Sequence, residues 1–209
     1  MKINLLIKLI KCKIMRYLII VFLLVFSTIY ANILSPTMPK ALTVFNKNIQ
    51  VKEVKEVKFQ GGFDKFKKKF RLKESTNNPD TINSTGMLGF YGFGSRARKE
   101  CGYEHITIDG FKRNPKIWSV EDQDKAFIKY LKINKKRISS IIKMYNNKVI
   151  GGVVITESGL LAACHLVGAG NVKKYFETNG EFIFSDDNKT STKDYLTEFG
   201  GYKFDLTKL

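Results

Sequence analysis

Gly61-Gly-Phe-Asp-Lys-Phe-Lys-Lys-Lys-Phe-Arg-Leu-Lys-Glu74 is the stretch of sequence from which the fold can be worked out. Its apolar residues recur at Phe63, Phe66 and Phe70, in steps of three and four, as they do on one face of an α-helix. Glu74 follows after another step of four and therefore belongs to the same face. The pattern predicts a helix that packs phenylalanines into a core and carries a carboxyl group on its buried side.

A carboxyl group in such a position suits acid-base chemistry. Burial disfavours the charged carboxylate and raises the pKa, so a glutamic acid can stay protonated near neutral pH and donate a proton. A second interpretation remains open, in which Glu74 lies past the helix end and faces solvent. Periodicity alone favours this second interpretation, and the residues that follow Glu74 favour the first.

Three short blocks of the chain carry a resemblance to a known family. Glu74-Ser75 stands at the end of the predicted helix, Gly86-Met-Leu-Gly-Phe-Tyr-Gly-Phe-Gly94 follows about a dozen residues later, and Leu161-Ala-Ala-Cys-His-Leu-Val-Gly-Ala-Gly-Asn-Val172 comes last. In this order they resemble the lysozyme-like superfamily, specifically the lytic transglycosylases and muramidases that cleave the glycan strands of peptidoglycan. The resemblance covers roughly residues 63 to 175. It implies a mainly α (α+β) fold, a compact helical domain with a small β-excursion and a substrate cleft.

The resemblance also implies roles for individual residues. Glu74 matches the catalytic acid, and the implied substrate-binding positions are Ser75, Gly89, Phe90, Tyr91 and His165. Two positions depart from the family pattern. Gly92 stands where the family usually carries Gln, which removes a group expected to hold an N-acetyl sugar. Cys164-His165 stands where the family carries Tyr-Asn, which keeps a polar ring but changes its geometry.

The glycine-rich block Gly86–Gly94 is predicted to be a tight ribbon or loop. Four glycines in nine residues weaken both a helix and a central strand. Glycine lets the backbone approach a ligand closely, and Phe90, Tyr91 and Phe93 have flat faces on which sugar rings stack. The alternative is a structural hairpin with its aromatic rings in the core. We favour a ligand contact for Tyr91 and leave both interpretations open for Phe90 and Phe93.

The supply of acidic residues bears on the reaction type. Cleavage of a glycosidic bond needs a proton on the leaving oxygen and stabilisation of an oxocarbenium-like transition state. The transglycosylase route, as the resemblance implies, uses one Glu as acid and then as base, while the sugar's own 6-hydroxyl attacks. Between Glu74 and Glu100 the only other acid is Asp80, in a Pro-Asp turn context. This shortage favours a transglycosylase over a hydrolase, for which the more distant candidates are Asp122, Asp124 and Glu157.

A second Glu-Ser pair occurs in Thr156-Glu157-Ser158. We interpret Thr156 as a helix N-cap and Glu157 as an acid in the first helical turn. The family's glycine turn comes after its Glu-Ser pair and before its Ala-Ala block, as it does for Glu74. This order favours Glu74 as the catalytic acid, and Glu157 is kept as the alternative.

The 209 residues suit one domain with appendages. Tyr17–Tyr30 is a run of fourteen uncharged residues that follows several basic ones, a layout typical of a secretory signal peptide. An uncleaved membrane tether through residues 17–30 is the alternative. We predict a signal peptide or anchor at 1–31, a linker at 32–58 and a lysozyme-like catalytic domain at 59–209. The implied location is periplasmic or secreted.

Charge and cysteine content narrow the expected partners. The net charge is +17, and loss of residues 1–31 with their five basic residues would leave +12. For an exported basic protein, peptidoglycan is the expected partner rather than nucleic acid. We expect a monomer with no cofactor. We also expect no metal, because the histidines and cysteines lack metal-binding spacing. Cys101 and Cys164 could form one disulfide, or they could remain free buried thiols.

The rest of the chain predicts further short elements. A short helix is expected at 95–100 and an extended excursion at 105–111 that turns at Asp109-Gly110. Ser119 is expected to cap a helix with Ala126, Phe127, Tyr130 and Leu131 inward. Another helix is expected around 138–145, then an extended piece at 150–155, a helix at 159–167 that breaks at 168–170, and a last helix at 194–199.

Overall fold

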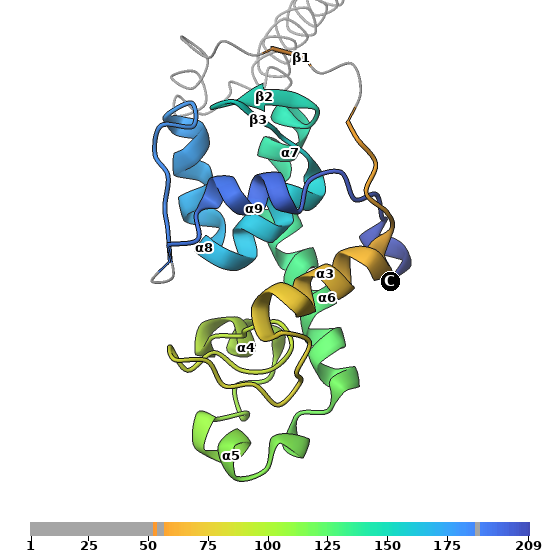
Figure 1. The fold of residues 1–209 in the computed structure, drawn as a ribbon, viewed down its shortest axis with the longest axis vertical. Coiled ribbons are helices and arrows are strands. Elements are labelled where there is room, and N and C mark those ends of the chain that lie inside the picture. Colours follow the sequence, from red (N-terminus) through yellow and green to blue (C-terminus); the bar gives the residue numbers. More distant parts are fainter. Residues whose placement is uncertain (1–51, 54–56, 187–188) are drawn as a thin grey trace, which may run out of the picture. The chain divides into compact units, whose positions relative to one another are not determined.

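The computed structural model describes residues 52–53, 57–186 and 189–209 (Figure 1). The predicted signal peptide or anchor and most of the predicted linker lie outside the described residues. Within them, seven α-helices and two short 3₁₀ helices accompany one small sheet. The mainly α, α+β prediction is confirmed at this level.

Helix α3 (Phe63–Ser75) confirms the periodicity of the opening stretch. Phe66 and Phe70 are fully buried. Their rings meet Phe127 of helix α6 (Val120–Arg137) with centroid distances of 6.2 and 4.9 Å. The helix is capped at Thr76, whose backbone is left-handed with φ of 52°. The Thr76 N–H donates to the Leu72 carbonyl oxygen, and the Asn77 N–H donates to that of Arg71. This packing fixes the end of α3, where Glu74 lies.

The long helix α6 begins as predicted. The Ser119 hydroxyl accepts a hydrogen bond from the Asp122 N–H at 3.1 Å, which caps the helix. Ala126, Phe127 and Leu131 are buried on its inner face. Helix α4 (Ser95–Cys101) confirms the short helix predicted at 95–100.

The segment after α4 corrects the prediction of an extended excursion. Residues Ile108–Arg113 form helix α5, followed by the 3₁₀ helix η1 (Pro115–Ile117). The Thr107 hydroxyl accepts a hydrogen bond from the Gly110 N–H at 3.0 Å, so Thr107 is an N-cap and Asp109 lies in the first turn. Local capping therefore outweighs the β-forming tendency of the residues before it.

The sheet has three short antiparallel strands in the order β1 (Lys52–Glu53), β2 (Lys148–Ile150) and β3 (Val153–Val154). Gly151 and Gly152, with φ of 57° and 80°, make the turn between β2 and β3. Strand β1 comes from the predicted linker and pairs with β2. Lys52–Glu53 is thus an edge strand of the sheet.

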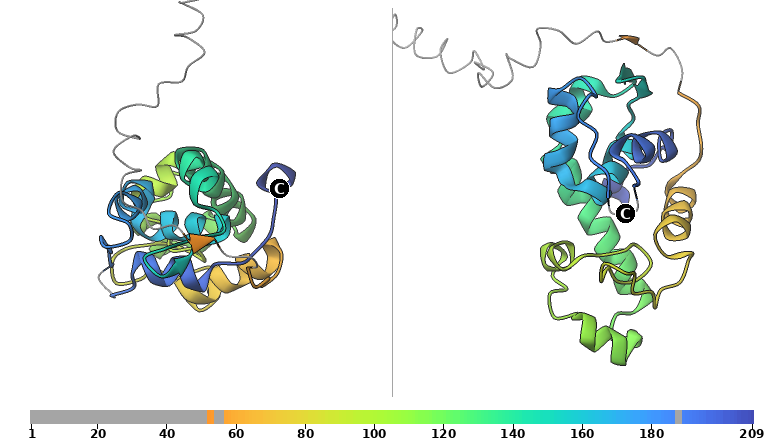
Figure 2. Two further views of the ribbon diagram at one scale, coloured as in Figure 1. Left: turned by 90° about the horizontal axis from the view of Figure 1, so that it is seen from above. Right: turned by 60° about the vertical axis from the view of Figure 1, so that its left-hand side comes forward.

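The C-terminal half consists of α7 (Ser139–Tyr145), α8 (Glu157–Glu177), α9 (Thr192–Glu198) and the 3₁₀ helix η2 (Leu206–Lys208). Gly168, at φ 78° and ψ 154°, interrupts α8 at the predicted break. The segment after α9 returns to the start of α3, where the Gln60 N–H bonds the Gly201 carbonyl and the Lys203 N–H bonds the Gly61 carbonyl, both at 2.9 Å (Figures 1 and 2). Helix α9 is thereby tied to the helix that carries Glu74.

Both cysteines of the described domain are free and buried. The Cys101 thiol lies 3.4 Å from the Ala126 carbonyl oxygen. The disulfide considered from the sequence is not formed in this structure. Within residues 57–186 and 189–209, no helix combines the length and the apolar character needed to cross a bilayer.

We predict that Phe70→Ala lowers the free energy of unfolding by about 3–5 kcal/mol, because the ring is fully buried and its loss leaves a cavity. The matched control is Leu72→Ala on the same helix. Leu72 is 52% exposed, so its truncation is expected to change stability by no more than about 0.5 kcal/mol. Chemical denaturation checks both variants, and equal losses would contradict the packing described for α3.

Candidate active site

A pocket of about 540 Å³ contains the Glu74 carboxyl group. Its lining comes from the end of α3, the stretch 83–94 with the glycine loop, helices α4 and α6, the middle of α8, residues 184–186, Thr190 and α9. The lining residues that matter for its chemistry are Glu74, Gly92, His165, Phe184, Asp186 and Tyr195.

Burial raises the pKa of Glu74 from its ordinary value of 4.5 to about 7. The neighbouring charge of Asp186 raises this pKa further, while the Tyr195 hydroxyl and the Lys73 ammonium group lower it. The raised pKa makes the protonated form of Glu74 accessible near neutral pH. This is the state that the buried-face interpretation predicts, and the solvent-facing alternative does not apply.

Tyr195 makes the closest polar contact to the acid. Its hydroxyl donates a hydrogen bond to Glu74 Oε1. Burial and the neighbouring Glu74 raise the pKa of Tyr195 well above its ordinary value, so the phenol keeps its proton. The hydrogen bond stabilises the carboxylate once the proton has left, and it leaves Oε2 as the oxygen that carries the transferable proton.

The sequence did not single out Tyr195. It lies 121 residues from Glu74, and no local motif links the two. The one available signal was the position of Tyr195 on the apolar side of the last predicted helix, beside Leu196 and Phe199. All three side chains are buried.

Gly92 lies directly against the acid. A Cβ atom at this position would stand 3.0 Å from Glu74 Oε2, and the backbone is left-handed with φ of 60°. The family's Gln at this position therefore has no room in this conformation. With Gly92 in place of the Gln of the resembled family, the backbone itself lies next to the Glu74 carboxyl group, with no side chain between them.

Three side chains hold the loop before Gly92. The Ser75 hydroxyl lies 3.0 Å from the Phe90 carbonyl oxygen, and the Gln123 side-chain oxygen accepts a hydrogen bond from the Phe90 N–H at 2.8 Å. His165 Nε2 donates to the Tyr91 carbonyl oxygen at 2.6 Å. The three side chains come from α3, α6 and α8. Together they fix the backbone that positions Gly92.

Gly89 serves the same loop. Its φ is 74°, and a Cβ atom there would stand 2.4 Å from Gln123 Oε1. Glycine is needed here so that Gln123 can reach the backbone of Phe90. Neither Ser75 nor Gly89, both predicted to bind substrate, lines the pocket. The Ser75 hydroxyl holds the loop from its buried side, and Gly89 leaves room for Gln123 to do so.

The stacking role expected for Tyr91 is wrong in this structure, and Phe90 offers no face either. Tyr91 is fully buried, and its ring stacks on Phe127 at a centroid distance of 4.0 Å. Its hydroxyl donates to Asp124 Oδ1 at 2.6 Å and accepts from Arg71 Nε at 2.9 Å. Phe90 is 6% exposed, with the Arg71 guanidinium 4.3 Å from its ring centre. The hairpin alternative, with aromatic rings in the core, is confirmed by the pairing of Leu88 with Phe93.

His165 lines the pocket, but its imidazole is uncharged and supports the glycine loop. Burial lowers the pKa of His165 to about 4. A carbonyl oxygen only accepts, so Nε2 carries the ring proton. Four aromatic rings meet the imidazole edge to face at centroid distances of 5.0 to 5.9 Å: Phe70, Phe93, Phe127 and Tyr130. The geometry suits positioning of the loop rather than proton transfer.

None of the three distant acids considered from the sequence lines the pocket of Glu74. Asp124 is bound by Arg71 and by Lys67 at 3.0 Å. Asp122 Oδ2 lies 2.9 Å from the Ser119 hydroxyl at the start of α6.

The second carboxyl group of the pocket is instead Asp186, whose Oδ1 accepts the Thr190 N–H at 2.7 Å. It lies in an irregular stretch with no motif to mark it.

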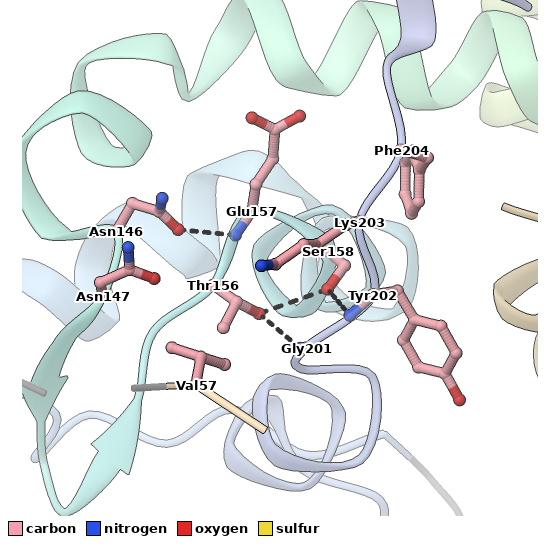
Figure 3. A pocket seen from close by; sticks show the side chains of 10 residues that line it. All are labelled: Val57, Asn146, Asn147, Thr156, Glu157, Ser158, Gly201, Tyr202, Lys203 and Phe204. Carbon is pink, nitrogen blue, oxygen red and sulfur yellow. Dashed lines mark hydrogen bonds between the residues drawn. The ribbon is translucent and has the colours of Figure 1, made fainter. Parts of the chain in front are cut away.

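Glu157, the alternative acid, belongs to a different pocket of about 240 Å³ (Figure 3). Its carboxylate points away from Thr156 and Ser158 and forms an ion pair with Lys135 at 2.6 Å. Thr156 caps α8 by accepting the Gly159 N–H at 3.2 Å, as predicted. Glu157 therefore has the contacts of a first-turn acid with a basic partner.

A metal centre has no ligand set in the described part of the chain, because no three His, Cys, Asp or Glu side chains come together there. The titratable side chains that line the pocket are those of Lys73, Glu74, Arg96, Tyr130, His165, Asp186 and Tyr195.

We predict that Glu74→Gln gains stability relative to the unchanged protein as the pH rises. The folded-state pKa of Glu74 is raised, so its protonated form stabilises the fold fully below about pH 4.5, and this contribution is lost as the pH rises through about 7. The difference in the free energy of unfolding between the two proteins should change by about 3 kcal/mol from pH 4 to pH 8. Denaturation across this pH range measures it. The contribution of His165 is common to both proteins, and a difference independent of pH would contradict the raised pKa.

We predict that Gly92→Ala lowers the free energy of unfolding by about 1–2 kcal/mol, since it places a side chain in a left-handed conformation and crowds Glu74. Gly170→Ala in α8 is the matched control, because a Cβ atom there meets nothing within 4 Å. It should leave stability equal or slightly higher. Thermal or chemical denaturation compares them, and a neutral Gly92→Ala would show that the loop does not need glycine here.

In the comparisons with known proteins, no family model, curated protein or solved structure matches this chain.

Proposed function

We propose that this chain is a peptidoglycan-cleaving glycosidase of lysozyme-like type, acting on the bond between N-acetylmuramic acid and N-acetylglucosamine. The observation that carries the proposal is the Glu74 carboxyl group, which lines a pocket with a pKa raised to about 7. Its place at the end of α3, beside a glycine loop held from α8, agrees with what the three-block resemblance implies. The lysozyme-like domain at 59–209 and its cleft are part of this proposal.

The first step of the proposed reaction is proton transfer. Glu74 Oε2 gives its proton to the glycosidic oxygen as the bond from that oxygen to the anomeric carbon breaks. The leaving sugar departs as an alcohol, and positive charge develops on the sugar that remains. Glu74 is then a carboxylate, which Tyr195 stabilises through its hydrogen bond to Oε1.

Two routes complete the reaction. In the transglycosylase route, the 6-hydroxyl of the same sugar attacks the anomeric carbon and its proton returns to Glu74, which leaves an anhydro ring. In the hydrolytic route, a water molecule attacks instead and gives a reducing end. We propose the first route, which the resemblance implies and for which a single carboxyl group suffices. Asp186 is the specific observation that makes a hydrolytic muramidase the second candidate.

Export, and action as a monomer on the cell wall, belong to the same proposal. They rest on the predicted signal peptide or tether and on the basic composition. A lysozyme-like module that binds glycan without cutting it is the non-catalytic alternative, motivated by Gly92 in place of Gln.

The test is digestion of purified peptidoglycan by the whole chain, with the products identified by mass spectrometry. We expect anhydro-muropeptides for the transglycosylase route and products one water heavier for hydrolysis. Glu74→Gln should lower the rate by at least about 100-fold, the usual contribution of a general acid. Glu157→Gln is the matched control and should leave the rate within about twofold, because its carboxylate pairs with Lys135 in another pocket.

Two results would overturn the assignment. If Glu74→Gln retained full activity, Glu74 would not be the acid. If the unchanged protein gave no products, the glycan-binding alternative would take its place.

A further inference from the structure

One wall of the Glu74 pocket exposes an aromatic ring that the reaction itself does not need. Phe184 lines the pocket and is 38% exposed. It belongs to a run of three exposed apolar residues, Phe182, Ile183 and Phe184. Of these three, Phe184 alone lines this pocket.

The position of Phe184 is fixed by its backbone. Its carbonyl oxygen accepts hydrogen bonds from the Thr192 N–H at 2.9 Å and from the Thr192 hydroxyl at 3.1 Å. Thr192 is fully buried at the start of α9. The next residue, Ser185, forms a β-bridge with Ser191. The exposed ring is thus attached to the helix that also carries Tyr195.

An exposed aromatic ring at a pocket wall, on a backbone held by hydrogen bonds, suits a ligand that is apolar on one face and polar at its edge. A pyranose ring has this character, since its axial C–H groups form an apolar face and its hydroxyl groups point outward. Packing of the C–H face on the phenyl ring removes apolar surface from water on both partners. Asp186, two residues further along the same wall, supplies an acceptor for sugar hydroxyl groups.

We propose that Phe184 is the stacking platform for a sugar ring of the glycan strand in the Glu74 pocket, in place of the buried Tyr91 and Phe90. The proposal rests on the proposed function for the class of ligand and goes beyond it by naming the residue that binds the sugar. Phe184 positions substrate and takes no part in proton transfer.

The experiment measures binding without cleavage. In the Glu74→Gln background, affinity for purified peptidoglycan strands and for an N-acetylglucosamine oligomer is measured by calorimetry or NMR titration. Phe184→Ala should weaken binding by about tenfold or more, the scale expected for loss of a ring contact. Phe184→Tyr should restore it. Phe182→Ala is the matched control and should bind like the parent, because Phe182 is 37% exposed but lies outside the pocket lining.

In the cleaving protein, Phe184→Ala should raise KM more than it lowers kcat. Equal binding by the Phe184→Ala and Phe182→Ala proteins would overturn the proposal, and so would a parent protein that binds neither probe at millimolar concentration. Failure of the proposed chemistry is recognised separately. If the unchanged protein produces no cleavage while binding still depends on Phe184, the platform stands and the glycosidase assignment falls.

Discussion

The candidate site depends on a carboxyl group that is largely removed from water at the end of α3, where it lines the pocket. The Phe66 and Phe70 rings pack this helix against α6, and the periodicity that buries them also turns Glu74 inward. Burial of an acid is unfavourable for its charged form, so the pKa of Glu74 is raised from 4.5 to about 7. The same packing that stabilises the fold therefore prepares the acid. If α3 ended one turn earlier, Glu74 would not lie on its buried face.

The glycine loop completes the site through its backbone. Bonds from Ser75, Gln123 and His165 fix the loop at Phe90 and Tyr91. With the loop fixed, Gly92 lies close to Oε2 without a side chain between them. The two positions that depart from the pattern of the resembled family thus contribute to one arrangement. Gly92 leaves space beside the acid, and His165 supplies the bond that keeps the loop there.

Much of this fold could be predicted because it depends on local chemistry. The helix that carries Glu74 follows from the spacing of its phenylalanines, and the caps at Ser119 and Thr156 follow from their side-chain oxygens. Helix α5 was missed, although Thr107 is a residue that caps helices, because the residues before it looked extended. The break of α8 at Gly168 was visible from its glycines.

The site was less predictable because its parts come from distant segments. Tyr195 and Asp186 reach Glu74 only through the packing of α9 and the stretch before it, and no spacing in the sequence encodes that contact. The burial of Tyr91 depends on Phe127 and Asp124, which belong to another helix. A sequence pattern identifies the type of residue in a loop, whereas the direction in which its ring points is set by tertiary contacts.

The most direct test of the central claim is an NMR titration of the Glu74 side-chain carboxyl carbon in the unchanged protein, assigned with the Glu74→Gln variant. The account predicts a midpoint near pH 7, because burial raises the pKa to about 7. A midpoint near 4.5, the ordinary value for a glutamic acid, would show that Glu74 is ionised at neutral pH and would contradict its role as the proton donor.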